Sequence, residues 1–212
     1  MSDWLSVERT FIEDALIKVN ISKYLNNALS SAGFSRIEIQ KTPVLTRITV
    51  YVLNPGRVIG RGGKNVDMLT ETIKGRFAVE NPQISVMEVE NKMLEPLLVA
   101  KDLAQRLERG INPRRLLYQT LRSIIESGAL GAEIRLSGKL AAKGARARSM
   151  IKSVGYMPKA GDVTNLVREA ITAAHPKYGA IGIRVRIVPP GTLFPDRTMK
   201  PIELPKSILS TN

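Results

Sequence analysis

The stretch Val58-Ile59-Gly60-Arg61-Gly62-Gly63-Lys64-Asn65-Val66 decides how the first half of this 212-residue chain is interpreted. Glycine stands at both ends of a four-residue turn, after an apolar pair and before a helical pattern. Because Gly60 and Gly63 lack side chains, the backbone of another polymer can approach the turn closely. Amides at the start of the following helix attract anions, and the Arg61 and Lys64 cations add to that attraction. The stretch therefore indicates a loop that holds the phosphates of a nucleic acid.

Other glycine-rich motifs fit this loop less well. A P-loop requires glycine five residues before Gly63 and serine or threonine after Lys64, but the chain has Val58 and Asn65 there. A dinucleotide fingerprint that starts at Gly60 would need glycine where Asn65 stands. An ordinary tight turn remains the alternative interpretation.

Hydrophobic periodicity around the loop predicts helices and strands in a definite order. The predicted elements are a helix that Ser6 caps and Gly33 ends, strands at residues 36–40 and 47–52, a short helical turn at 57–59, the loop, a helix at 66–73 and a strand at 84–89. This is the order of a type II KH domain, in which the GxxG loop clamps the sugar-phosphate backbone of about four nucleotides.

The second half of the chain predicts another mixture of helices and strands. Its predicted elements are a helix from Pro96 to Gly110, a helix that Asn112 caps and Gly128 ends, a strand at 133–136, a turn and irregular strand within 141–158, a helix from Asp162 through Ile171 and a strand at 183–187. Five prolines after residue 188 indicate an extended tail. We therefore predict an α+β fold with a type II KH domain at residues 1–92, a second α+β domain at 93–190 and a proline-rich tail at 191–212.

The charge of the chain is large and unevenly distributed. The formal net charge is +13, of which residues 1–90 contribute +1 and residues 91–212 contribute +12. A protein this basic usually binds a polyanion, most often nucleic acid. A solvated face that only maintains solubility is the alternative, although solubility needs a net charge of only about 2–8.

Two groups of cations in the second half are candidate phosphate contacts. Arg114 and Arg115 open the helix that Asn112 caps, where they oppose the helix dipole, so phosphate is the expected counter-charge. Pairing with Glu108 or Asp102 is the alternative. The run Lys139 to Lys159 holds no acid and predicts a surface that follows a phosphate backbone. The predicted RNA-binding residues are Gly60, Arg61, Gly62, Gly63, Lys64, Arg114, Arg115, Lys139, Lys143, Arg146, Arg148 and Lys152.

No residue pattern predicts catalysis, a metal site or a cofactor. The chain has no cysteine and a single histidine, His175, so a zinc site is not expected. No serine–histidine–aspartate or cysteine–histidine arrangement can be built with sensible spacing. The chain shows neither a signal peptide nor an apolar run of about 18 residues, so a cytoplasmic location is expected.

Several segments together resemble the small-subunit ribosomal protein S-three family in its archaeal and eukaryotic form. The segment at residues 127–140 is far more specific than the GxxG loop, which many KH proteins share. The resembling segments are residues 11–14, 39–43, 58–64, 80–84, 127–133, 137–140 and 181–185.

The resemblance implies a non-catalytic constituent of the ribosome. Such a protein binds ribosomal RNA in the head of the small subunit, contacts neighbouring head proteins and helps form the channel by which messenger RNA enters. Bacterial relatives contact messenger RNA through basic residues near a helix start. Arg114 and Arg115 match these positions, whereas Tyr118 stands where the bacterial pattern has lysine. A free-standing KH regulator of messenger RNA and a nucleic-acid lyase or endonuclease are the alternatives.

Overall fold

The computed structural model contains two compact units. Residues Met1–Glu90 form the N-terminal unit and residues Asn91–Asn212 the C-terminal unit. The residues that the structure describes are 3–42, 45–77, 79, 81–140, 146–177 and 179–195.

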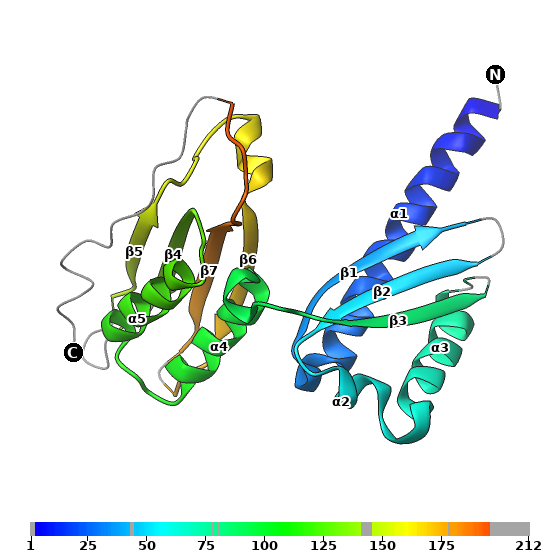
Figure 1. Cartoon of the computed structure of the whole chain (residues 1–212), viewed down its shortest axis with the longest axis horizontal. Coiled ribbons are helices and arrows are strands. Elements are labelled where there is room, and N and C mark those ends of the chain that lie inside the picture. The colour runs from blue at the N-terminus through cyan, green and yellow to red at the C-terminus, as the bar shows by residue number, and fades with distance from the viewer. Residues whose placement is uncertain are drawn as a thin grey trace. The chain divides into compact units, whose positions relative to one another are not determined.

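In the N-terminal unit, helices cover one face of a sheet (Figure 1). The sheet has the strand order β1-β2-β3, in which β1 and β2 run antiparallel and β2 and β3 run parallel. The elements are α1 (Asp3–Ala28), β1 (Phe34–Lys41), β2 (Thr46–Val52), α2 (Pro55–Ile59), α3 (Lys64–Phe77) and β3 (Pro82–Glu88), with a 3₁₀ turn at Ser30–Ala32 and another at Arg61–Gly63.

Alternation along β2 fixes which face of this sheet is buried. Ile48, Val50 and Val52 are fully buried, whereas the residues between them are only partly covered. Ile21 of α1 and Ile73 of α3 are also buried, so both helices contribute to the core. Period-two alternation on a strand under period-3.6 helices produces this packing.

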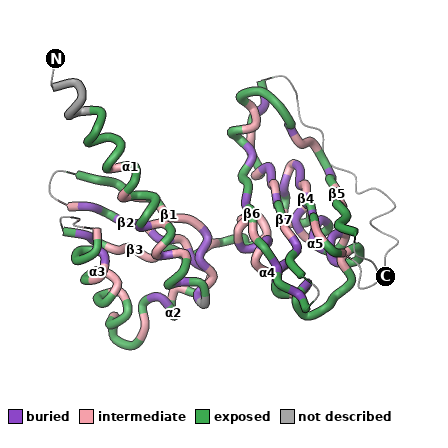
Figure 2. Tube along the Cα trace, turned by 180° about the vertical axis from the view of Figure 1, so that it is seen from behind, coloured by how far each residue is buried: buried purple, intermediate pink, exposed green. Residues whose placement is uncertain are grey.

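Residues 8–20 of α1 do not contribute to that core. Phe11, Ile12, Leu16 and Val19 are exposed by 73%, 60%, 56% and 49%. Figure 2 shows the exposed stretch of α1 ahead of the buried residues near its C-terminal end. The helix itself begins at Asp3, so the prediction that Ser6 caps it is wrong and Ser6 lies inside the first turns.

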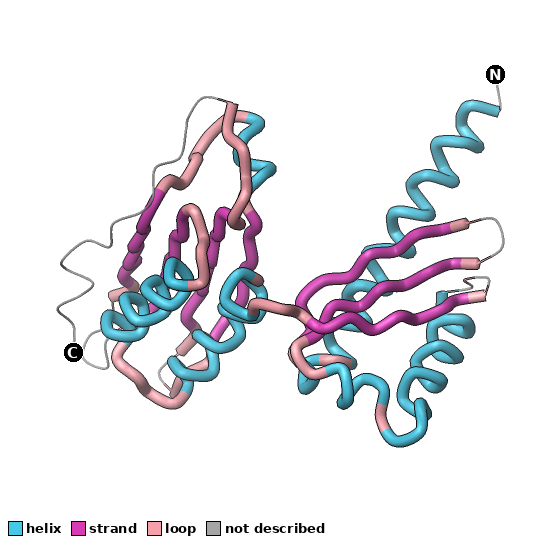
Figure 3. Tube along the Cα trace, in the orientation of Figure 1, coloured by secondary structure: helices cyan, strands magenta, loops and turns pink. Residues whose placement is uncertain are grey.

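The C-terminal unit also consists of helices packed on a sheet. Its sheet is antiparallel and has the strand order β5-β4-β7-β6. Both α4 and α5 pack on one face of it (Figures 1 and 3). The elements are α4 (Pro96–Glu108), α5 (Pro113–Glu126), β4 (Gly131–Gly138), β5 (Arg148–Gly155), β6 (Arg168–Ala174) and β7 (Ile181–Val188), with 3₁₀ turns at Lys92–Leu94 and Asp162–Leu166.

The core of this unit lies between the helices and the middle strands. Leu103 and Leu121 from the helices and Ile134, Leu136 and Val185 from the strands are at most 1% exposed. Both halves of the chain are therefore mixtures of helix and sheet, and the predicted α+β class is confirmed.

One predicted element in this unit is wrong. The sequence predicted a helix from Asp162 through Ile171, but only a 3₁₀ turn forms there, and the chain then continues as strand β6. Ala170 and Ile171 lie opposite Val185 and Arg184 of β7, so ladder hydrogen bonds replace the expected helical ones. Five of the ten residues in this stretch are apolar and three of those five are β-branched, and such a short pattern does not distinguish strand from helix.

Two further predictions concern strand β5 and the tail. The irregular strand expected within residues 141–158 is the regular strand β5, while residues 141–145 lie outside the described part. Of the tail expected from residue 191, the structure describes only 191–195. In that stretch Phe194 packs on Tyr156, with ring centres 5.0 Å apart.

Candidate nucleic-acid interface

The GxxG loop joins α2 to α3 through three glycines in left-handed backbone conformations. The φ angles of Gly60, Gly62 and Gly63 are +71°, +65° and +81°. A Cβ at Gly60 would also lie 2.6 Å from the Asn65 side-chain nitrogen, so another residue there would strain the backbone and displace Asn65. Nothing lies within 4 Å of the Cβ position of Gly62, which leaves the top of the loop open to a ligand.

An open cavity of about 590 Å³ lies against this loop, and cations line it. Arg57, Arg61 and Lys64 contribute positive charge, and no carboxylate is among its lining residues. The Asn65 side-chain amide donates a hydrogen bond to the Arg57 carbonyl at 3.3 Å, which ties the start of α3 to α2. The geometry suits an anion that passes close to glycine backbone.

The candidate arginines of the C-terminal unit open α5. The Arg114 backbone N–H donates to Asn112 Oδ1 at 3.0 Å, so Asn112 caps this helix as predicted. Both arginine side chains are exposed. The carboxylates that could have paired with them are engaged elsewhere, since Asp102 accepts from Arg106 at 2.9 Å and Glu108 accepts from the His175 backbone N–H at 2.9 Å.

Strand β5 brings further cations to the same end of this unit. The short turn after α5 reverses the chain into β4, so the first turn of α5 lies near the last residues of β4. Arg148 pairs with Gly138 at that end of β4, which Lys139 follows directly. Lys152 Nζ lies 5.3 Å from the centre of the Tyr118 ring on α5. We call Arg114, Arg115, Lys139, Arg146, Arg148 and Lys152 the basic surface; the predicted Lys143 lies outside the described residues.

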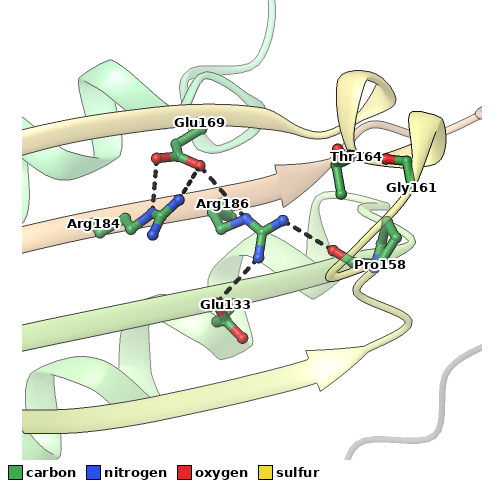
Figure 4. A network of polar contacts seen from close by, with 7 residues as sticks. All are labelled: Glu133, Pro158, Gly161, Thr164, Glu169, Arg184 and Arg186. Carbon is green, nitrogen blue, oxygen red and sulfur yellow. Dashed lines mark hydrogen bonds and ion pairs between the residues drawn. The ribbon is translucent and has the colours of Figure 1, made fainter.

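Other arginines of the C-terminal unit are occupied by internal carboxylates (Figure 4). Arg184 donates to both oxygens of Glu169, at 2.7 and 2.8 Å, and this pairing raises the pKa of Arg184. Arg186 lies 3.5 Å from Glu133 and donates to the Pro158 carbonyl at 2.9 Å. These two cations hold the sheet together and are not part of the basic surface.

Sequence reasoning missed some cations near these sites. Arg57 lines the loop cavity, and its position three residues before Gly60 could have indicated this. Lys177 is exposed and lies two residues before Gly179, whose Cβ position is 3.7 Å from Lys139 Cδ. Nothing in the local sequence marks Lys177, because the sheet brings these two loops together.

Within the described ranges, no group of His, Cys, Asp or Glu could hold a metal ion. No described helix has the length and apolar character that crossing a membrane requires.

Comparison with known proteins matches both units to ribosomal and RNA-binding families. The family model "KH domain" matches residues 20–94, and "Ribosomal protein S3, C-terminal domain" matches residues 103–187. The chain is 41% identical to the small ribosomal subunit protein uS3 of Methanobrevibacter smithii over 90% of its own length and 76% of that protein. It belongs to the uS3 family. The uS3 proteins of Methanospirillum hungatei (91% of this chain, 81% of that protein) and Methanococcus maripaludis (90% of each) are both 42% identical to it.

Membership in the uS3 family confirms the resemblance that residues 127–140 and the other segments indicated. It also confirms a non-enzymatic protein, because the uS3 relatives are named as ribosomal subunit proteins. The KH match covers the GxxG loop and the C-terminal match covers the described basic surface.

Proposed function

We propose that this chain binds ribosomal RNA in the head of the small ribosomal subunit and helps form the channel by which messenger RNA enters. Membership in the uS3 family supports the coarser part, a constituent of the cytoplasmic small subunit. The finer part, which RNA is touched and where, rests on the two candidate interfaces.

The basic surface is the observation that carries this proposal. Its exposed cations come from the first turn of α5, the end of β4 and the start of β5. Arg114 and Arg115 have no carboxylate partner among the described residues, although Asp102 and Glu108 are near in sequence. Cations held without internal counter-charges are available to phosphates, and each phosphate contact releases condensed counterions.

The two halves of the chain have different parts in this proposed role. Residues 1–92 act as a KH module that grips a strand at Gly60 to Lys64, and residues 93–190 act as the module that anchors the protein on folded RNA. Residues 191–212 serve as a tail that contacts a neighbour in the subunit. The division is supported by the uneven charge, because almost all of the positive excess lies after residue 90.

The exposed part of α1 supports a protein neighbour in addition to RNA. Ile12, Leu16 and Val19 form an exposed apolar strip on one face of α1, with Phe11 beside it. The four acids and three cations of this helix nearly cancel, so the surface is not strongly basic. Exposed apolar strips of this kind usually mark protein contacts. We assign the strip to another protein of the subunit head.

A salt titration tests the anchoring role directly. The purified chain should bind a small-subunit ribosomal RNA fragment with an affinity that falls steeply as salt rises. Changing Lys139, Arg146 and Arg148 to glutamine should reduce that slope by about one for each of these cations that neutralises a phosphate. The matched control changes Arg9, Lys18 and Lys23 of α1 to glutamine, which removes the same charge from exposed positions outside the basic surface. Equal slopes for the two triple variants would contradict the proposal.

A further inference from the structure

One face of the sheet in the C-terminal unit carries no helix in the described part of the chain (Figure 3). Helices α4 and α5 pack on the side where Ile134, Leu136 and Val185 are buried. Because successive side chains of a strand point to opposite faces, the residues between those core positions lie on the other side. We call this side the open face; it consists of the alternate residues within 133–137 of β4, 149–153 of β5, 169–173 of β6 and 182–186 of β7.

One row of the open face runs across all four strands and combines two isoleucines with two arginines. Ile151 of β5 lies opposite Arg135 of β4, and Arg135 lies opposite Arg184 of β7. Arg184 in turn lies opposite Ile171 of β6. Ile151 and Ile171 are 51% and 68% exposed, so an aliphatic side chain faces solvent at each end of the row. Adjacent strands lie about 4.8 Å apart, which makes the row about 14 Å long.

The two arginines of this row differ in their counter-charges. Arg184 donates to both oxygens of Glu169, at 2.7 and 2.8 Å (Figure 4). Glu133, the other acid on the open face, lies 3.5 Å from Arg186. Arg135 is exposed and has no carboxylate or other polar partner among the residues that the structure describes. Like charges directly opposite one another on a sheet are destabilising, so an external carboxylate beside Arg135 would offset a cost of the folded chain.

The composition of the open face favours a protein over RNA. RNA offers phosphates and base edges, but little aliphatic surface to contact the two isoleucines. Glu133 and Glu169 repel phosphate, and these two acids with three arginines leave the face a net charge of only +1. Strand β5 separates the two sides of the unit, because Lys152 lies on the side of α5 whereas Ile151 lies on the open face. Arginine beside apolar side chains is typical of protein interfaces.

We propose that the open face binds an extended segment of another protein of the small subunit, with a carboxylate beside Arg135 and an apolar side chain against each isoleucine. Alternate side chains of an extended segment lie about 6.7 Å apart, so residues four positions apart span about 13 Å. This span matches the length of the row. The segment therefore carries an aspartate or glutamate with an apolar residue two positions to each side. The inference adds a protein-binding surface to the proposed function and rests on assembly into the small subunit.

Photocrosslinking within intact subunits identifies what lies on the open face. A benzophenone amino acid replaces Ser137, an exposed position of this face, in the full chain, and small subunits assembled with that chain are irradiated. The expected product joins the chain to another protein, at a segment with the acidic and apolar pattern given above. The matched control replaces Arg148, which lies on the other side of β5 and should attach to RNA. Attachment at Ser137 to RNA, to another part of this chain or to nothing would overturn the inference.

Charge reversal tests the contact of Arg135. Arg135→Glu should lower retention of the crosslinked protein in subunits washed with high salt by about tenfold or more, because two acids then face each other. Mass spectrometry of the washed subunits measures that retention relative to this chain. Changing the carboxylate of the captured segment to lysine should restore retention in the Arg135→Glu background. Ile171→Thr, which keeps a β-branched residue on β6, should lower retention to a smaller degree. Ile111→Thr, at an exposed isoleucine between α4 and α5, should leave it unchanged.

The affinity for RNA separates this inference from the proposed function. Arg135→Glu should keep the salt slope of the unchanged chain on a small-subunit ribosomal RNA fragment, because Arg135 is not part of the basic surface. Full retention in both Arg135→Glu and Ile171→Thr subunits would reject the open face as a protein contact and leave RNA binding intact. An unchanged chain whose affinity for the fragment does not vary with salt would instead reject the anchoring role, whatever covers the open face.

Discussion

Lys152 Nζ lies 5.3 Å from the centre of the Tyr118 ring, which joins strand β5 to helix α5 on the basic surface. Lys152 is half-buried, and a cation held over an aromatic face is attracted by the ring quadrupole. The contact holds this positive charge near Arg114 and Arg115, because Tyr118 lies one turn further along the same helix. Tyr118 therefore supports the basic surface through Lys152, although it carries no charge itself.

The first prediction concerns messenger RNA. Replacing Arg114 and Arg115 with alanine should slow initiation on structured messengers more than on unstructured ones, because the exposed cations at the start of α5 are proposed to contact the incoming strand. Initiation rates on reporter pairs that differ only in a hairpin measure this. Arg122→Ala is the control on the same helix, since Arg122 already pairs with Glu126 at 2.8 Å. An equal slowing on both reporters would reject a role in the channel.

The second prediction separates the two halves of the chain. Arg61→Asp combined with Gly62→Asp should weaken the contacts of the GxxG loop, since it reverses one charge and adds bulk where the loop is open. The basic surface should still hold the protein on ribosomal RNA. Co-sedimentation with small subunits in high salt measures retention, and crosslinking measures the loop contact. Complete loss from the subunit would show that the loop, and not the C-terminal unit, anchors the protein.

The third prediction compares two glycines by their effect on the free energy of unfolding. A Cβ at Gly131 would collide with the Tyr156 carbonyl oxygen, so Gly131→Ala should destabilise the C-terminal unit by about 1–3 kcal/mol. Gly75 lies inside α3 with nothing within 4 Å of its Cβ position, so Gly75→Ala should stabilise the N-terminal unit by about 0.5–1 kcal/mol. Urea unfolding followed separately for each unit provides the measurement. Similar effects at both positions would mean that the close approach to Tyr156 is absent in solution.

The fourth prediction concerns the pH dependence of stability. Burial lowers the pKa of the Lys101 ammonium on α4 below its ordinary value of 10.5, so the charged form is less favourable in the folded chain than in the unfolded one. This costs stability below the folded-state pKa, and the cost disappears as pH rises to 10.5. Lys101→Met should therefore stabilise the protein at neutral pH, with a gain that shrinks in alkaline solution. Lys18→Met, at an exposed position, should show no such trend in the same urea titrations. A gain for Lys101→Met that does not vary with pH would be due to packing.

Much of the fold could be predicted from periodicity and punctuation. Strand β2 alternates strictly, and Asn112 and Pro113 mark the start of α5 without ambiguity. Strand β6 could not be predicted in this way, because its partner β7 follows it in the chain and decides its conformation by ladder pairing. The apolar spacing of Phe11 to Val19 predicted a helix correctly, but it could not reveal that the core of the N-terminal unit leaves these residues exposed.

The candidate interfaces were predictable in part for similar reasons. The GxxG loop is contiguous in sequence, so its residues could be named from the chain alone. The cation contact of Lys152 with Tyr118 and the closeness of Lys139 to Gly179 depend on sheet register, which pairs residues that are far apart along the chain. Sequence gives the number of cations but not which of them face carboxylates of the same molecule.

The carboxylate-paired arginines of the C-terminal unit change what its composition means for binding. Five arginines of this unit each lie within 4 Å of an internal acid: Arg106, Arg122, Arg168, Arg184 and Arg186. Each of these ion pairs is nearly neutral toward an approaching RNA. The number of small ions displaced when RNA docks should accordingly follow the uncompensated lysines and arginines. A count of all lysines and arginines in the unit would overestimate the number of ions displaced, and the excess would equal the number of cations that pair with acids inside the unit.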